Sequence, residues 1–525
     1  MLFMKRPNIL FIMSDDHASN AISSYGSRFA DIAPTPNIDR IGNEGVRLEN
    51  CYCTNSICTP SRATIITGQY SHTNGVKTLC DFLTTDTPTL PELLQESGYS
   101  TALFGKWHVG AHPKGFDQWA VLPGQGFYND PSFIFPDEES APEGTIVDEI
   151  TDDLFSYPNE RKEHGGFGVM TRLPGYVTEL TTDMSLDWLN DSRDPDKPFF
   201  LCCHHKAPHD FFEYHHKYEN LFDGIELPEP ETLFEDDDTL NEISRKYGST
   251  VSDRCPEVSM LKRLQQENYP NGGPVDFEGL DFKARTRKAY QKYMKDYLRT
   301  VRSIDDNVGR LLDWLDESGE AENTIVIYTS DQGMMLGEHD KIDKRWIFNE
   351  SQQMPFLMRY PAEIKAGQVC HDMVDNVDFA PTLLNYAGLE APEFMQGRNA
   401  CSVLEGNAPA DWRQSVYYRY WMHMAHHWIP AHYGLRTPDH MLVFFYGMVL
   451  DASGCFHPDC QKNTDPGFEL YDLKKDPFET TNVYDDPAYL DIREELKQQL
   501  QQMKQDVGDT DERYPELASL WEKMS

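Results

Sequence analysis

Three continuous apolar runs stand out along the chain, and a polar cluster directly follows each of them. The runs are Asn8–Met13, Lys197–Cys203 and Thr324–Thr329. Apolar runs of this length, bounded by polar residues, predict strands buried on both faces, as in a parallel sheet. Asp15 and Asp16 follow the first run, His204–His209 the second, and Asp331 and Gln332 the third. Because sites in open α/β sheets lie beyond the carboxyl ends of the strands, we expect these clusters to meet in one site.

Helical spacing of apolar residues predicts helices between these strands. They are Pro88–Glu96, Thr178–Asn190, Lys283–Asp316 and Asp378–Tyr386. Beyond about residue 400 the pattern changes to short strands and a polar helix, which are Ser415–Tyr420, Met441–Tyr446, Glu469–Leu473 and Leu490–Lys504. We therefore expect an α/β fold with a central, mostly parallel sheet in residues 1–400. A smaller C-terminal subdomain in residues 401–525 is expected to hold an antiparallel sheet and a terminal helix.

The composition narrows the classes of protein. Of 525 residues, 39% are hydrophobic, which is enough for a sizeable core, and the formal net charge is −39. A charge of this sign argues against binding to nucleic acid or to an anionic membrane surface. Eleven cysteines are too thinly spread for a disulfide framework, although Cys455 and Cys460 either pair or remain free thiols. No signal peptide or membrane span is recognised, so the expected compartment is the cytoplasm, or the periplasm or exterior if a leader was removed.

The carboxylates at the strand ends are candidates for a metal site. Two adjacent carboxylates inside a fold repel each other unless a cation compensates them, although an isolated pair such as Asp15-Asp16 is also typical of a turn or helix cap. With Asp331 and Gln332 the set consists of three carboxylates and one amide oxygen. An all-oxygen set indicates a hard cation, Ca²⁺ or Mg²⁺.

A second candidate group surrounds Cys58. In the segment Cys58-Thr59-Pro60-Ser61-Arg62, Pro60 suits the first turn of a helix and Gly68 suits its end. Cys58 is therefore expected at a helix N-terminus, where the helix dipole favours an anion. On the residues alone, a buried free cysteine and a thiolate nucleophile both remain possible.

The pentapeptide Cys58-x-Pro60-Ser61-Arg62 resembles the signature of type I sulfatases, in which the cysteine is oxidised to formylglycine. Other elements match that family in the same order, from residue 7 to about residue 480. They are Gly105–His108, Pro208-His209, Ser330–Gly333, Leu336–His339 and Asp343–Arg345. The resemblance implies an alkaline-phosphatase-like sandwich, hydrolysis of a sulfate ester and a maturation enzyme that converts Cys58 to formylglycine.

The resemblance also implies roles for individual residues. Ca²⁺, rather than Mg²⁺, would be held by Asp15, Asp16, Asp331, Gln332 and formylglycine 58. Many members of the family have Asn at the position of Gln332. The catalytic set would comprise Cys58 as the modified nucleophile, Arg62 and Lys106 beside it, His108 for the second step or for sulfate, His209 as the acid for the leaving group, and Lys344 on the sulfate. A hydrated aldehyde would attack sulfur, and its second hydroxyl would allow sulfate to be expelled.

The substrate is expected to be a sulfated saccharide. The segment His423–Tyr433 and the following residues to Arg436 are rich in histidine and aromatic residues, which stack on sugar rings. The run Ala431–Arg436 and the element Asp343–Arg345 look similar to bacterial carbohydrate sulfatases of the N-acetylglucosamine-6-sulfatase and iduronate-2-sulfatase groups. The histidine-rich segment could equally be a packed strand and loop between domains. The expected substrate-binding residues are His339, His426, His427 and Arg436.

Two other functions remain open from the sequence. A phosphonate or phosphate diester hydrolase of the same superfamily would share the nucleophile and the metal. A protein that binds sulfated glycans without catalysis is a different class, and the complete set of motif residues argues against it. The resemblance further implies a monomer or a homodimer.

Overall fold

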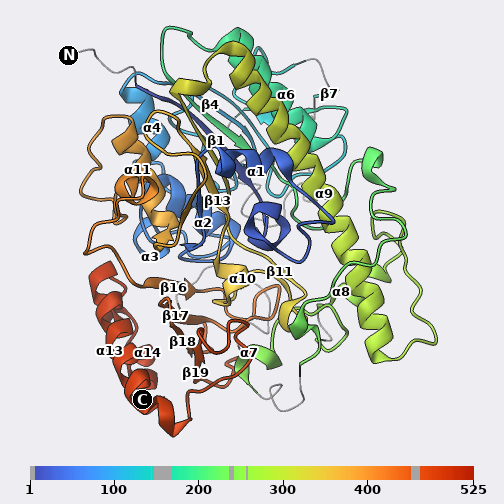
Figure 1. Ribbon diagram of the computed structural model, residues 1–525, viewed down its shortest axis with the longest axis vertical. Coiled ribbons are helices and arrows are strands. Elements are labelled where there is room, and N and C mark those ends of the chain that lie inside the picture. The colour runs from blue at the N-terminus through green and yellow to red at the C-terminus, as the bar shows by residue number, and fades with distance from the viewer. Residues whose placement is uncertain are drawn as a thin grey trace.

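The computed structural model describes residues 6–142, 145–146, 168–235, 242–255, 258–450 and 462–524. Its centre is an 11-stranded mixed sheet (Figure 1). In spatial order the strands are β14 (Gln368–Cys370), β2 (Val46–Leu48), β13 (Phe356–Arg359), β10 (Thr324–Ser330), β1 (Asn8–Ser14), β9 (Phe199–His204), β4 (Ser100–Gly105), β5 (Gln118–Val121), β6 (Ser132–Phe135), β8 (Val169–Arg172) and β7 (Thr145–Ile146). Cys455 and Cys460 lie outside the described residues, so their pairing stays open.

The three strands predicted from apolar runs are confirmed and lie side by side. β1 pairs in parallel with β10 on one side and with β9 on the other, and every residue of the three strands is buried. In the registers, Ser14 lies opposite Ser330 and Met13 lies opposite His204. The three carboxyl ends therefore stop at the same edge of the sheet.

Helices cover both faces of the sheet because its buried side chains alternate between two cores. In β1, Ile9, Phe11 and Met13 belong to one core, and Leu10 and Ile12 to the other. Figure 1 shows the two groups of helices on opposite sides of the strands. The first core is covered by α2 (Cys58–Thr67), α4 (Leu90–Glu96) and α11 (Phe379–Tyr386), and the second by α1 (Pro36–Asn43), α6 (Val177–Asp187) and α9 (Phe282–Ser318).

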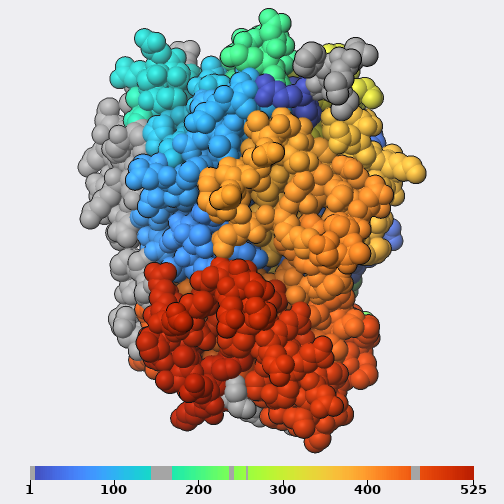
Figure 2. Space-filling view, turned by 90° about the vertical axis from the view of Figure 1, so that its left-hand side faces the viewer, coloured from blue at the N-terminus to red at the C-terminus, as the bar shows by residue number. Residues whose placement is uncertain are grey.

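The C-terminal part contains a four-stranded antiparallel sheet. Its strands are β16 (Val416–Tyr420), β17 (His432–Arg436), β18 (His440–Phe445) and β19 (Gly467–Asp472), and α13 (Leu490–Val507) and α14 (Pro515–Met524) pack on it. The predicted strands and helix are confirmed. For the segment that contains β17 the sequence left saccharide binding and a packed strand both open, and β17 forms an inner strand of this sheet. Figure 2 shows this part, in red, packed against the blue and orange segments.

The small sheet shares an apolar cluster with segments from the N-terminal part of the chain. Cys58, Met335 and Trp346 pack in one apolar cluster with Tyr418 of β16 and Val443 of β18. The boundary expected near residue 400 stays a prediction, and residues 400–404 pack with the large-sheet core.

Short elements complete the described chain. They are β3 (Cys51–Tyr52), β11 (Met335–Leu336), β12 (Ile342–Asp343), β15 (Val374–Asp375), α3 (Ser71–Asn74), α7 (Ile243–Lys246), α8 (Met260–Leu264), α10 (Asn349–Gln352) and α12 (Cys401–Leu404). Across the part of the chain that the structure describes, no helix has both the length and the apolar character needed to cross a membrane.

Candidate active site

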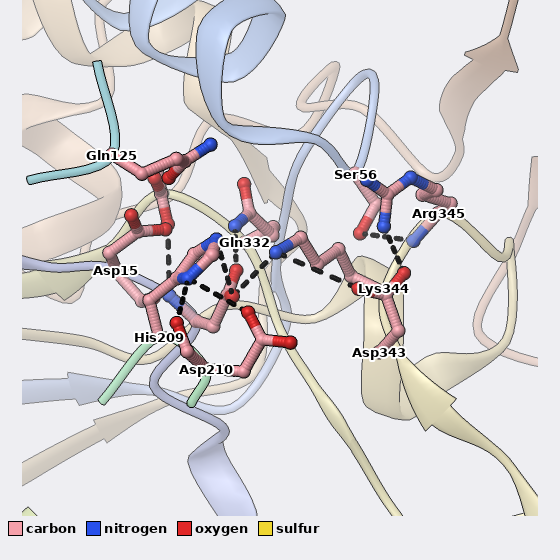
Figure 3. A network of polar contacts seen from close by, with 12 residues as sticks. Asp15, Ser56, Gln125, His209, Asp210, Gln332, Asp343, Lys344 and Arg345 are labelled. Carbon is pink, nitrogen blue, oxygen red and sulfur yellow. Dashed lines mark hydrogen bonds and ion pairs between the residues drawn. The ribbon is translucent and has the colours of Figure 1, made fainter. Parts of the chain in front are cut away.

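The ends of β1 and β10 bring the predicted acidic residues together. The backbone N–H of Asp331 donates to the carbonyl of Ser14 at 3.2 Å, and the N–H of Asp16 donates to Oδ1 of Asp331 at 3.2 Å. Asp16 has a left-handed backbone (φ +64°), which turns the chain sharply after the strand. Gln332 donates from its amide to Oδ1 of Asp16 (Figure 3). The parallel register thus makes one cluster from residues more than 300 positions apart.

Each of the three carboxylates has its own cation. Arg62 donates from Nε to Asp331 at 2.8 Å, Lys344 donates from Nζ to Asp16 at 2.5 Å, and Lys106 pairs with Asp15. All six side chains are almost completely buried. Charges removed from water require such pairing, because an uncompensated buried charge costs several kcal/mol. Three charges of each sign cancel, so the protein groups form a neutral cluster.

The oxygen atoms of this cluster fit a hard cation. Among the described residues, no hydrogen-bond partner is found for Oδ1 of Asp15 or Oε1 of Gln332, and both atoms are buried. Single ligand atoms of Asp15, Asp16 and His209 lie within 4.8 Å of one another. Carboxylate and amide oxygens are what Ca²⁺ takes from proteins. The longer arm of Gln332 still reaches the cluster, and a divalent cation would give the neutral group a net positive charge suited to an anion.

Cys58 begins α2, as its sequence predicted. All ten residues of the helix are buried, and Gly68 ends it in the left-handed conformation (φ +63°). Burial raises the pKa of the Cys58 thiol to about 11, and the nearby carboxylates of Asp331 and Asp16 add to this against the cations of Lys344 and Arg62. Burial therefore disfavours the thiolate form of the unmodified side chain.

The predicted Lys106 and His108 lie against the Cys58 segment. Gly105 ends β4 with φ +102°, and a Cβ there would lie 1.9 Å from the carbonyl oxygen of His204, so only glycine fits. The next residue, Lys106, donates to Oε1 of Gln125 at 2.5 Å and accepts from Arg62 through its carbonyl at 2.7 Å. His108 lies 3.4 Å from Thr59 Oγ1. The two matched motifs thus form one contact surface.

His209 extends the site from the loop after β9. Its Nδ1 lies 2.8 Å from the carbonyl of Asp210, which can only accept, so Nδ1 carries the proton and Nε2 faces Asp16 at 3.7 Å. Burial lowers the pKa of His209 to about 4, and the cations of Lys344 and Lys106 contribute to the shift. The imidazole is therefore neutral at neutral pH, with the lone pair of Nε2 directed into the cluster.

A pocket with a volume of about 380 Å³ opens over this cluster, within the size range of ligand sites. Figure 3 places Gln125 on one side of the polar network and Asp343 with Arg345 on the other, with Lys344 reaching between them. The pocket is lined by Cys58, Leu79, Gln125, Gly126, Phe127, Tyr128, Lys206, His209, Asp210, Phe211, Glu213, Arg263, Asp343, Lys344, Arg345, His426 and His427.

Two of the four expected substrate-binding residues line the pocket. These two residues are His426 and His427. The His427 ring is held on both sides, because Nδ1 lies 2.7 Å from Oγ of Ser249 and Nε2 lies 3.5 Å from the carboxylate of Asp343. Neither His339 nor Arg436 is part of the lining, so a substrate contact of these two residues stays a prediction.

Arg436 and His339 have structural partners instead. Arg436 is buried on the inner strand β17, where it pairs with Glu479 at 2.7 Å and donates to Gln352 at 3.1 Å. His339 pairs with the carboxylate of Glu235 and stacks on Phe348, with ring centres 4.6 Å apart. Every residue of β17 is buried, so both faces of this strand are covered by other parts of the fold.

Sequence reasoning assigned no role to several lining residues. Arg345 lies inside the matched element Asp343–Arg345, so its position could have suggested it, whereas Lys206 lies just before the matched Pro208-His209. Asp343, another lining residue, forms an ion pair with Arg345. Arg263 pairs with Asp210 from the separate helix α8, and this contact depends on tertiary packing that no local pattern reports.

The strand-end carboxylates, their cations and the helix-terminal cysteine define a hydrolase of the alkaline-phosphatase-like fold. The family model described as "Sulfatase" matches residues 7–389, and the model "N-sulphoglucosamine sulphohydrolase, C-terminal" matches residues 337–506. The chain belongs to the sulfatase family, and it is a sulfuric ester hydrolase.

The chain is similar to several characterised proteins. It is 37% identical to an N-acetylglucosamine-6-O-sulfatase of Bacteroides thetaiotaomicron, over 97% of this chain and 88% of that protein. A solved structure in complex with its substrate D-glucosamine-2-N,6-O-disulfate superposes with a TM-score of 0.81 and 36% identity, over 97% of this chain and all of the other. A phosphonate monoester hydrolase of Agrobacterium radiobacter shares the fold, at TM-score 0.69 and 20% identity over 96% of both chains.

Proposed function

We propose that the protein removes an O-sulfate group from a sulfated saccharide of the glucosamine type, with formylglycine at position 58 and Ca²⁺. The observation that carries this proposal is the place of Cys58 in the pocket, at the start of a buried helix and beside the six paired charges. The named activity of the similar Bacteroides protein and the disulfated glucosamine bound in the similar structure support a sugar of this kind.

Asp15, Asp16, Asp331 and Gln332 are the residues that would hold Ca²⁺, which supplies positive charge for the sulfate oxygens. Formylglycine supplies a hydrated aldehyde, with one hydroxyl for attack on sulfur and a second for release of the sulfate. Arg62 is held between the carboxylate of Asp331 and the carbonyl of Lys106, so it can fix the orientation of residue 58 on the same helix.

Lys344 and the two histidines act on the substrate side. Burial opposes the charge of Lys344, but Asp16 and Asp343 raise its pKa above the ordinary value, so it stays an ammonium group and donates to sulfate. His209 directs Nε2 into the cluster, and a bound sulfate would favour its protonation and hence transfer of a proton to the leaving oxygen. His108, next to the Cys58 segment, serves the second step as a base.

The experiment compares protein in which Cys58 has been matured with protein in which it remains a thiol, as verified by mass spectrometry of the Cys58 peptide. The sulfated substrates are N-acetylglucosamine 6-sulfate, its 3-O-sulfate isomer and an aryl sulfate. An aryl phosphonate monoester and a phosphate diester test the alternative hydrolase. We expect hydrolysis of the 6-sulfate only by the matured protein. Faster turnover of the phosphorus esters would favour the other hydrolase, and binding of the sugar without turnover by matured protein would favour a glycan-binding protein.

A further inference from the structure

The wall of the pocket contains a lysine that the proposed chemistry does not use. Lys206 follows β9, is 3% exposed and lines the pocket. Its ammonium group lies 4.8 Å from the ring centre of Tyr128, which is also part of the lining. Tyr128 is fixed in turn, because its hydroxyl donates to the carbonyl of His209 at 2.5 Å. The cation therefore has a rigid aromatic support.

The described residues include no carboxylate in ion-pair contact with Lys206. The other cations of the lining are paired: Arg263 with Asp210, Arg345 with Asp343, and Lys344 with Asp16. Glu213, an acidic lining residue, instead accepts a hydrogen bond from Asn129 at 3.2 Å. An aromatic face compensates a cation only weakly.

The charge of Lys206 is retained in spite of its burial. Burial lowers the pKa of Lys206 to about 8, while Asp210 and Glu213 act in the opposite direction, so the group is mostly an ammonium at neutral pH. A buried cation without a counter-ion is unfavourable, and such groups in a cleft are candidates for ligand contacts. An anionic ligand would supply the missing counter-charge.

Lys206 lies with Tyr128 on the side of the pocket formed by the loop of Gln125, whereas Asp343 and Arg345 line the opposite side (Figure 3). The mouth of the pocket also presents two aromatic rings, Phe127 and Phe211, which are 41% and 43% exposed. A sugar ring between such groups can direct one substituent to residue 58 and another to the wall of Lys206.

We propose that Lys206, supported by Tyr128, forms a subsite for a second anionic substituent of the saccharide. This substituent is a carboxylate, or a sulfate that is not the one cleaved. This inference rests on the proposed function. The probes are glucosamine 6-sulfate, the same sugar with an added N-sulfate or 3-O-sulfate, and a disaccharide that joins it to a uronic acid. The variants are Lys206→Met, which has a chain of similar length without charge, and Lys206→Arg.

We expect kcat/KM of the wild type to be higher for at least one doubly anionic probe than for the monosulfate. Lys206→Met should lower this preference about tenfold, the usual size of a charge-assisted hydrogen bond, and Lys206→Arg should retain most of it. Lys217→Met is the matched control, because Lys217 also lies over a tyrosine, at 5.0 Å from Tyr218, but outside the pocket. Thermal unfolding checks that each variant is folded.

The outcomes separate this inference from the proposed function. Hydrolysis of an aryl sulfate but of none of the sugars would overturn the proposed function and the subsite with it. Hydrolysis of the sugars with no preference for a second anion would overturn the subsite alone. So would an equal loss on all probes in Lys206→Met, which would assign Lys206 to the cleaved sulfate or to the packing of the pocket.

Discussion

The pairing of three carboxylates with three cations predicts what happens when one cation is removed. In Arg62→Met, Asp331 keeps its burial but loses the partner at 2.8 Å, and the carbonyl of Lys106 loses a donor at 2.7 Å. Removal of one member of a buried ion pair costs about 3–5 kcal/mol, because the remaining charge is uncompensated. The neutral cluster would then have a net charge of −1.

Calcium should recover part of this loss. A ligand that binds only the folded state stabilises it by about 2.7 kcal/mol at a concentration 100 times its Kd. Because the variant cluster is negative, it should bind Ca²⁺ more tightly than the neutral wild-type cluster does. We therefore expect Ca²⁺ to raise the apparent Tm of Arg62→Met by more than it raises that of the wild type.

The assay is thermal unfolding of both proteins in EDTA and in a series of Ca²⁺ concentrations. Arg413→Met is the matched control. Arg413 forms an ion pair of 2.6 Å with buried Asp378, which is not one of the three carboxylates at the strand ends. It should lower the apparent Tm without changing the response to Ca²⁺. Equal stability of Arg62→Met and wild type in EDTA would refute the charge argument, and an equal response to Ca²⁺ would refute the metal assignment.

Four further variants test other parts of the structure. Cys58→Ala in protein expressed with the maturation enzyme should abolish turnover while calorimetry still detects the saccharide; residual turnover would assign the nucleophile elsewhere. Although burial opposes the shift, Arg419 lowers the pKa of Asp509 to about 2. The ion pair therefore adds about 2 kcal/mol to the free energy of unfolding at pH values above the pKa of Asp509 in the unfolded chain, and this contribution is lost as the pH falls toward 2. Urea unfolding of Asp509→Asn should accordingly depend less on acid than that of the wild type. Arg436→Met should lower Tm and leave KM unchanged, whereas His426→Ala should raise KM; the reverse pattern would restore Arg436 to the pocket.

The sequence predicted the strand ends well because their chemistry is local. Continuous apolar runs define β1, β9 and β10, and parallel pairing then places Asp15, Asp331 and the loop of His209 at one edge without further information. The start of α2 at Cys58 follows similarly from Pro60 and Gly68 within one segment.

The substrate side was less predictable because it depends on contacts between distant segments. Arg436 lies in a histidine-rich stretch, yet the pairing of β17 with two neighbours and the ion pair with Glu479 bury it. Lys206 is the opposite case, since its lack of an ion pair within the described parts of the chain becomes visible only when the partners of Arg263 and Arg345 are known. Composition and spacing report which residues are present but not which of them neutralise one another.

The shared apolar cluster beneath the pocket has a consequence for protein engineering. Trp346 packs against His432 and Phe445 of the small sheet, and Cys58 belongs to the same apolar cluster, so residues that precede the expected boundary near 400 share a packing unit with the C-terminal strands. The C-terminal family model likewise begins at residue 337. A junction at residue 400 would pair one protein's Trp346 with another's sheet. An exchange of parts between relatives should therefore join the chains before Met335, and the segment of Cys58 then has to match the new sheet.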